Sequence, residues 1–214
     1  AELQKLFLAS WQQQKGPELV EGSHFPELKE AGQALVRIVG STPGQTNRIP
    51  FIMHVSAIAF AQSSVHMTNS YFVPDDQIVK ALTAAAKRGV DVKLLLPGIT
   101  DSQLALMAQR HHYSELLKSG VQIYELDTAL LHAKTAVVDQ IWSTVGSTNM
   151  DFLSLLHNDE VNAVILSREF AAEMEKMFAA DLEDARQIRW EEWKNRPWLP
   201  RVRAWLVNLF SQWL

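Results

Sequence analysis

One short segment constrains the fold of this chain more than any other. Residues His132–Asp139 read HAKTAVVD, and GSTN follows at positions 146–149. The apolar, β-branched middle of the first segment predicts a strand. Alternate side chains of a strand share a face, so His132 and Lys134 should project together into one pocket. A tight turn at Asp139-Gln140 and a returning strand would then bring residues 146–149 close to that pocket.

The residue types in this pocket indicate a particular chemistry. A histidine can act as nucleophile or acid, a lysine supplies a fixed positive charge, and small polar side chains donate neutral hydrogen bonds. Together they suit the transfer of a phosphoryl group from a phosphodiester. No metal or other cofactor is expected, because the chain has no cysteine and His111-His112 lacks the i, i+4 spacing of a zinc pair.

The motif formed by His132, Lys134 and Asp139, here called the HKD box, resembles that of the phospholipase D superfamily. More narrowly, the chain is similar to the C-terminal half of bacterial cardiolipin synthase-like proteins. Further segments that carry the likeness are 68–74, 84–92 and 158–162, and the resemblance covers most of residues 35–185. One departure is Gln140, where the family usually has a glycine that eases positive φ in the turn.

The resemblance also implies that one HKD box is half of an active site. Members of the superfamily use two boxes, in which one histidine attacks phosphorus and the other protonates the leaving alcohol. No second H-x-K-x4-D pattern occurs in this sequence. The chain is therefore expected to pair with a second copy of itself or with another half that carries the other box.

The resemblance assigns roles to five residues. His132 is the nucleophile or the general acid, and the sequence leaves both roles open. Lys134 would hold the phosphoryl oxygens as a point charge. Ser147 and Asn149 would donate hydrogen bonds to the non-bridging oxygens, although loop and helix-cap roles are the ordinary alternative. Glu160 would stand behind the imidazole and stabilise its charged form.

Three further residues have weaker assignments. Asp139 belongs to the HKD box, yet strand parity puts it on the face opposite His132, so a role in fixing the turn stands beside a catalytic one. Asn69 and Tyr71 come at the end of a predicted strand, where they would line the substrate pocket or simply pack.

The pattern along the chain predicts an α/β fold, a sandwich with a mixed sheet. The resemblance implies that this is the phospholipase D-like α/β/α sandwich. Strands are expected at 34–39, 64–69, 90–96, 121–126 and 160–166, besides the hairpin of the HKD box. Helices are expected at 49–62, 75–88, 102–118 and 168–184. We divide the chain into an N-terminal helix and linker (1–33, the end of an upstream half), a catalytic domain (34–185) and a tail (186–214).

The tail differs from the rest of the chain in charge and composition. Residues 185–214 hold six basic and two acidic residues, a net charge of +4, which leaves −8 for residues 1–184. The tail also has five of the seven tryptophans, and an apolar stripe over 201–214 predicts an amphipathic helix. Such a helix suits the surface of an anionic membrane, with docking on the protein itself as the alternative. The acidic body speaks against nucleic acid as a partner.

These features favour a cardiolipin synthase-like phosphatidyltransferase. It would pass a phosphatidyl group to phosphatidylglycerol through a phosphohistidine, as a peripheral protein on the cytoplasmic face of the bacterial membrane. One alternative is a homodimeric phosphodiesterase or nuclease of the same superfamily. The other is a catalytically incomplete half that binds lipid.

Overall fold

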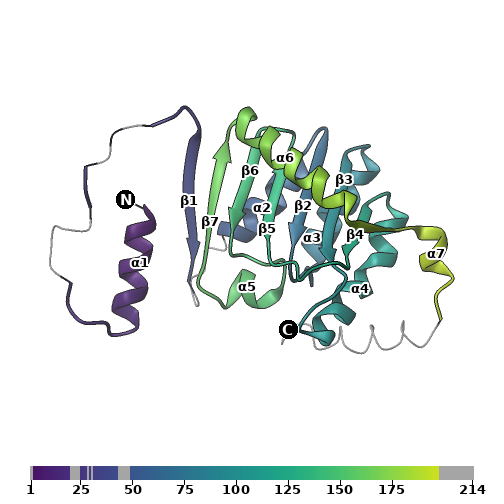
Figure 1. Ribbon diagram of the computed structural model, residues 1–214, viewed down its shortest axis with the longest axis horizontal. Helices are drawn as coiled ribbons and strands as arrows, with labels where there is room; N and C mark the ends of the chain where they lie inside the picture. The colour runs from purple at the N-terminus through teal and green to yellow at the C-terminus, as the bar shows by residue number, and fades with distance from the viewer. Residues whose placement is uncertain (1, 20–24, 28, 30, 43–48, 198–214) are drawn as a thin grey trace.

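An eight-stranded mixed sheet forms the centre of the computed structural model, which describes residues 2–19, 25–27, 29, 31–42 and 49–197. The spatial order of the strands is β1-β7-β6-β5-β2-β3-β4-β8 (Figure 1). The strands are β1 (Leu35–Ser41), β2 (Ser64–Asn69), β3 (Asp91–Pro97), β4 (Gln122–Leu126), β5 (Lys134–Val138), β6 (Trp142–Gly146), β7 (Glu160–Leu166) and β8 (Ala185–Ile188). β2, β3 and β4 are parallel, and every other neighbouring pair is antiparallel.

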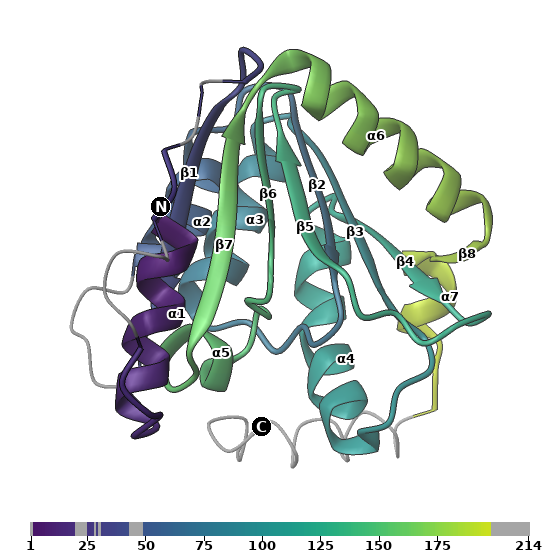
Figure 2. The ribbon, with the colours of Figure 1, turned by 60° about the vertical axis from the view of Figure 1, so that its left-hand side comes forward.

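Helices cover both faces of the sheet. They are α1 (Glu2–Gln13), α2 (Ile49–Phe60), α3 (Asp76–Lys87), α4 (Gln103–Lys118), α5 (Phe152–Leu156), α6 (Arg168–Glu183) and α7 (Trp190–Lys194). Figure 2 shows α6 on one face and α2 and α3 on the other. The larger core lies between the sheet and α2–α4, and a smaller one, built by Val137, Ala171 and Met174, lies under α6. The predicted α/β/α sandwich is thus confirmed.

The predicted boundaries of two strands, 64–69 and 160–166, match the structure, and the other predicted elements shift by one or two residues. Helix α3 begins where expected because the Asp75 carboxylate accepts the backbone N–H groups of Gln77 and Ile78. It ends before Gly89, whose φ of +94° an L side chain rarely adopts.

The C-terminal end of the domain lies further along the chain than the sequence analysis placed it. Strand β8 pairs with β4 from Ala185 onward, and Ile188 is buried in the main core. Trp193 of α7 then packs against Tyr113, with ring centroids 5.0 Å apart. The boundary predicted at 185/186 therefore falls inside β8. The predicted amphipathic helix over 201–214 lies outside the described residues. Among the residues that are described, no helix has the length and apolar character to cross a membrane.

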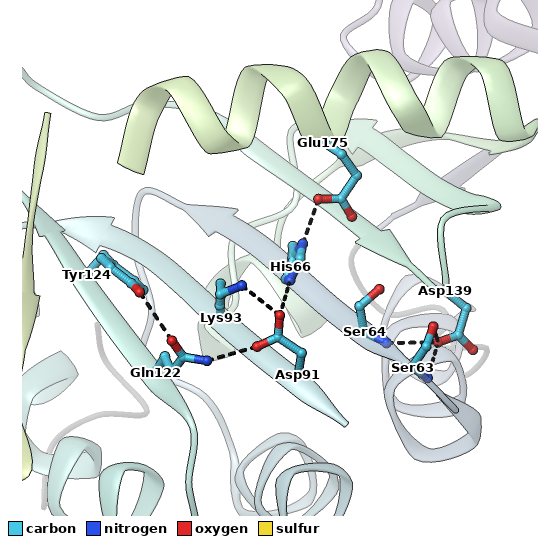
Figure 3. Close-up of polar contacts among 9 residues, drawn as sticks. All are labelled: Ser63, Ser64, His66, Asp91, Lys93, Gln122, Tyr124, Asp139 and Glu175. Carbon is cyan, nitrogen blue, oxygen red and sulfur yellow. Dashed lines mark hydrogen bonds and ion pairs between the residues drawn. The ribbon is translucent and has the colours of Figure 1, made fainter. Parts of the chain in front are cut away.

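Asp139 and Gln140 form the tight turn between β5 and β6. Both have positive φ, +52° and +55°, and the Ile141 N–H donates to the Val138 carbonyl at 3.3 Å. Positive φ at both central residues is typical of a type I′ hairpin turn. The turn is fastened to β2, because the Asp139 carboxylate accepts the backbone N–H groups of Gln62, Ser63 and Ser64 at 2.7–3.1 Å (Figure 3 draws Ser63 and Ser64).

This geometry predicts that Gln140→Gly stabilises the protein. A non-glycine residue with positive φ destabilises the folded state by roughly 1–2 kcal/mol. Glycine removes this strain, but its larger conformational entropy in the unfolded chain offsets part of the gain. We expect the free energy of unfolding to rise by about 0.5–1 kcal/mol, measured by urea denaturation. An unchanged or lower value would mean that the Gln140 side chain makes a contribution larger than the strain.

A polar cluster fastens α6 to the same end of the sheet (Figure 3). His66 of β2 lies between two carboxylates, with Nδ1 2.6 Å from Glu175 Oε2 and Nε2 3.2 Å from Asp91 Oδ2. Its ring stacks on Phe178 of α6, and Lys93 donates to Asp91 at 2.6 Å. In the β2–β5 ladder, Val65 pairs with Val138 near this cluster, whereas Lys134 pairs with Asn69 at the other end. The cluster and Lys134 therefore occupy opposite ends of the sheet.

Candidate active site

The residues of the predicted pocket gather where β2 ends and β5 begins. Asn69, the last residue of β2, is the register partner of Lys134, the first residue of β5. The segment after β6 is joined to the same place, because the Asn69 Oδ1 accepts the Met150 N–H at 3.0 Å and Met150 forms a bridge with Phe72. Three stretches that are distant in the sequence thus meet at one end of the central strands, close to α5 (Figure 1).

His132 and Lys134 are in direct contact, as strand alternation predicted, although β5 begins only at Lys134. The Lys134 Nζ lies 3.2 Å from His132 Nδ1 and donates to the His132 carbonyl at 2.9 Å. His132 is exposed, while Lys134 is buried with 8% of its surface accessible. An ammonium group only donates, so in this contact Nδ1 accepts and a neutral imidazole carries its proton on Nε2. Nε2 is the nitrogen left for a substrate.

Ser147 and Glu160 are bonded to each other. The Ser147 hydroxyl donates to Glu160 Oε2, and its oxygen accepts the Val161 N–H at 3.0 Å. The preceding Gly146 permits this close approach of β6 and β7, since a Cβ there would lie 2.0 Å from Asn162 Oδ1. The sequence analysis placed Glu160 behind the imidazole and Ser147 against phosphoryl oxygens. The structure puts the Glu160 carboxylate on Ser147, and within the described residues no hydrogen bond joins it to His132.

Asn149 sits between two serines that the sequence analysis did not single out. Its Oδ1 accepts the Ser70 hydroxyl at 2.7 Å, and its Nδ2 donates to Ser154 Oγ at 3.2 Å. Asp151 caps α5 and accepts the Ser154 N–H at 2.7 Å. A helix-start pattern, an acidic residue directly before an apolar run, marks Asp151 in the sequence and could have identified it. Nothing comparable marks Ser70.

The weaker assignments occupy the edge or the interior of this region. Asn69 is buried, and its amide oxygen serves the Met150 backbone as described. The Tyr71 hydroxyl donates to Asp101 Oδ1 at 2.5 Å, and this bond to a carboxylate raises the pKa of the tyrosine. Asp139 lies past the far end of β5, and the bonds it forms go to residues 62–64. The structure thus joins His132 to Lys134 and Ser147 to Glu160, and sets Asp139 apart from both pairs.

Burial shifts the pKa values of two charged groups here in directions that favour their neutral forms. It lowers the pKa of Lys134, an effect that the negative charges of Glu160 and Asp151 oppose. It also raises the pKa of Asp151 to about 6, although hydrogen bonds from Ser154 act against the shift; the charge of Glu160 adds to it. The negative charge of Glu160 therefore acts on both groups, and it favours the charged form of Lys134 and the neutral form of Asp151. Among the described residues, no three His, Asp or Glu side chains are placed to hold a metal ion.

The raised pKa predicts how Asp151 affects stability with pH. A carboxyl that titrates near 6 when folded and near 3.8 when unfolded holds its proton more tightly in the folded state. Its contribution to stability is therefore lost as the pH rises from about 4 to about 6, by roughly 1–3 kcal/mol. We expect Asp151→Asn, which keeps a good helix cap, to be more stable than the wild type at pH 7.5 and to lose this advantage at pH 4.5. Urea denaturation at the two pH values measures the difference, and a gap between the two proteins that stays the same at both would contradict it.

Comparisons with known proteins agree with this geometry. A family model described as "Cardiolipin synthase, PLD-like domain" matches residues 55–182. The cardiolipin synthase of Halalkalibacterium halodurans is 34% identical over 213 residues, which cover 98% of this chain and 42% of that protein. Cardiolipin synthase A of Proteus mirabilis is 32% identical, over 96% of this chain and 43% of that protein. The chain thus spans less than half the length of these curated relatives.

Two solved structures share the fold. The phospholipase D family member Nuc from Salmonella typhimurium has a TM-score of 0.62 and 24% identity, over 73% of this chain and 99% of Nuc. The phosphatidylserine synthase of Haemophilus influenzae has a TM-score of 0.65 and 12% identity, over 90% of this chain and 50% of that one. The family model covers well over half of the chain, including the HKD box and the segment after it, so this chain belongs to the family of cardiolipin synthase, phospholipase D-like domains.

Proposed function

We propose that this chain supplies one half of a phosphatidyltransferase site that makes cardiolipin. The observation that carries the proposal is the contact between the exposed His132 and the buried Lys134. The negative charge of Glu160 acts on Lys134, and all three residues lie within the part of the chain that matches the cardiolipin synthase family. An imidazole open to solvent can reach a large substrate, while a buried cation next to it holds a phosphate oxygen. The second HKD box would come from another copy of the chain or from another half.

The proposed reaction proceeds in two displacements at phosphorus. In the first, an imidazole nitrogen forms a bond to the phosphorus of phosphatidylglycerol, and the bond from phosphorus to the glycerol oxygen breaks. The other histidine gives its proton to that oxygen, and glycerol leaves. In the second, the hydroxyl group of another phosphatidylglycerol attacks phosphorus, loses its proton to the same histidine and releases the first imidazole. Both roles remain open for His132.

The surrounding charges suit this sequence of steps. Lys134 would bind a non-bridging oxygen, and an N–H of Asn149 would stabilise the charge that grows on a second one. Bound phosphate would also compete with Nδ1 for the ammonium group of Lys134. The Glu160 carboxylate favours the charged form of Lys134, as the opposed pKa effects show. Asp139 is proposed to act indirectly, by fixing the β5–β6 turn onto residues 62–64.

The location proposed for this chemistry is the cytoplasmic face of the bacterial membrane. A phospholipid substrate with an anionic headgroup is met there, and the sequence of residues 198–214, with two arginines, no acidic residue and three tryptophans, suits such a surface. Deletion of residues 198–214 tests this point by sedimentation with phosphatidylglycerol liposomes. The proposal expects the shortened chain to stay in the supernatant.

The function itself is tested by measuring mass and activity on the same sample. Light scattering gives the oligomeric state, and labelled phosphatidylglycerol liposomes report cardiolipin and free glycerol, with His132→Ala as the control. A dimer that forms cardiolipin only when His132 is intact would establish a site completed by two copies. An inactive monomer would require the second HKD box from another half, which can then be added. Release of phosphatidic acid in place of cardiolipin would show that the enzyme hydrolyses the substrate and does not transfer the phosphatidyl group.

A further inference from the structure

Three buried side chains connect the candidate site to helix α5. Asp151, Ser154 and Ser70 have 4%, 2% and 3% of their surface accessible. The Asp151 carboxylate accepts the backbone N–H of Ser154 at 2.7 Å. A hydrogen bond from the Ser154 hydroxyl acts on the same carboxyl, where it lowers the pKa against the effect of burial. Ser154 Oγ in turn accepts the Nδ2–H of Asn149. The bonds therefore run in one direction, from Asn149 through Ser154 to Asp151.

The direction of these hydrogen bonds determines the orientation of the Asn149 carboxamide. A serine hydroxyl has one hydrogen, and here that hydrogen goes to a carboxylate that can only accept. Ser154 Oγ is thus left as an acceptor, which only the amino end of the carboxamide can satisfy. The oxygen end must then face Ser70, which donates to it at 2.7 Å. The second amino hydrogen of Asn149, a half-exposed residue, stays available to a ligand.

We propose that Asp151 is a positioning residue, which acts through Ser154 to hold the Asn149 carboxamide with one N–H aimed at a phosphoryl oxygen. The ligand of Asn149 in this inference rests on the proposed function, whereas the orientation of its carboxamide does not. If Asp151 takes up a proton, it can donate to Ser154 Oγ. The serine hydrogen is then free for the oxygen end of Asn149, and the carboxamide can reverse.

Three titratable groups act on Asp151, each from a different part of the site. Glu160 of β7 repels its negative charge and favours the protonated acid. Lys134 of β5 attracts that charge, and Tyr71, which follows β2, interacts with it as well. Because the pKa of Asp151 is raised to about 6, the orientation of the Asn149 carboxamide should depend on pH close to neutrality.

A simpler role for Asp151 is to cap α5, and one variant separates the two roles. Asp151→Asn retains a good cap, since asparagine accepts the same backbone N–H. It cannot become a carboxylate, so it mimics the protonated acid at every pH. Asp75→Asn is the matched control, because Asp75 caps α3 by the same kind of bonds to Gln77 and Ile78.

The experiment follows the side-chain amide of Asn149 by ¹H–¹⁵N NMR, with the resonance pair assigned by its loss in Asn149→Asp. Between pH 4.5 and 7.5, we expect the pair to shift with a midpoint near 6 in the wild type and in Asp75→Asn. In Asp151→Asn the pair should stay at its low-pH position throughout. Persistence of the midpoint in Glu160→Gln and in His132→Ala, together with its loss in Asp151→Asn, would assign the titration to Asp151. Identical chemical shifts of the Asn149 amide resonances in wild type and Asp151→Asn at pH 7.5 would overturn the proposal and leave Asp151 as a helix cap.

Kinetics supply a separate second readout. In the assembled enzyme, Asp151→Asn should lower kcat by about 10- to 100-fold, the usual scale for a displaced transition-state donor, with little change in KM. A rise in KM with kcat unchanged would count against the positioning role. If turnover is unchanged in His132→Ala, the proposed function fails. The NMR result still determines the orientation of the Asn149 carboxamide.

Discussion

His132→Ala should lower the rate of cardiolipin formation by at least about 10⁴-fold in the assembled enzyme. Removal of a nucleophile, or of the acid that serves the leaving group, eliminates the covalent pathway, and the loss is of this order for residues that act as a unit. Within the described residues, the group at His132 Nδ1 is the Lys134 ammonium, which cannot take over either role.

Lys134→Met provides a graded comparison. It removes the charge while it keeps an unbranched apolar stem in a buried position, so the protein should fold and still carry the nucleophile or acid. The variant should lose the charge stabilisation alone, about 10²–10³-fold in kcat. His111→Ala, on α4, is the matched histidine control and should remain active.

Thin-layer chromatography of ³²P-labelled lipid measures the product over this range, and thermal unfolding confirms that each variant is folded. Residual cardiolipin formation in His132→Ala within tenfold of wild type would contradict a role for His132 in either displacement. The phosphohistidine itself, whose P–N bond is labile in acid, is tested by rapid quench into an alkaline denaturant, where ³²P label retained on the protein assigns the nucleophile. Label in the wild type and none in His132→Ala would place it on this residue.

The sequence was most informative where side-chain pattern and local stop signals coincide. Helix α3 shows this well, because Asp75 at its start and Gly89 after its end define both boundaries without tertiary information. Strand β2 was equally well predicted. By contrast, β8 contains Arg186 and Gln187 and exists because β4 offers it an unpaired edge, which no pattern within residues 185–188 reveals.

For the candidate site, local spacing predicted the contact that depends on local geometry and missed those that depend on other strands. The spacing of two residues was enough to predict the contact of His132 with Lys134, although His132 precedes β5. The partner of Glu160 depends on the pairing of β6 with β7, which brings Ser147 within hydrogen-bond distance of its carboxylate. The raised pKa of Asp151 likewise needs burial, a property of the assembled fold.

The second large effect should be on stability, at a buried carboxylate of β4, which lies three strands from β5 in the sheet. Glu125 of β4 is buried with 1% of its surface accessible, and it pairs with two arginines. Arg110 of α4 donates to both of its oxygens at 2.9 Å, and Arg186 of β8 donates to Oε2 at 2.7 Å. The Tyr113 hydroxyl adds a bond to Oε1 at 3.1 Å. One carboxylate thus links β4 to both α4 and β8.

Glu125→Ala should lower the free energy of unfolding by roughly 3 kcal/mol. Loss of one partner from a buried ion pair leaves the other charge without its counterion, which typically costs 3–5 kcal/mol. The value lies at the lower end because both arginines are partly exposed and can turn to water. Urea denaturation measures the change, and Glu173→Ala, an exposed position on α6, is the matched control with an expected change below about 0.5 kcal/mol.

The double variant Glu125→Leu with Arg110→Met separates the cost of an unpaired charge from the value of the pair. If burial of a lone charge causes the instability, an apolar replacement of both partners should recover much of the loss, because such exchanges are often neutral. Failure to recover would show that the carboxylate is needed to hold β8 through Arg186. Hydrogen exchange then distinguishes the two cases, since loss of that link should raise exchange at the β8 amides that pair with β4, while the amides of β2 and β5 beside the candidate site remain protected.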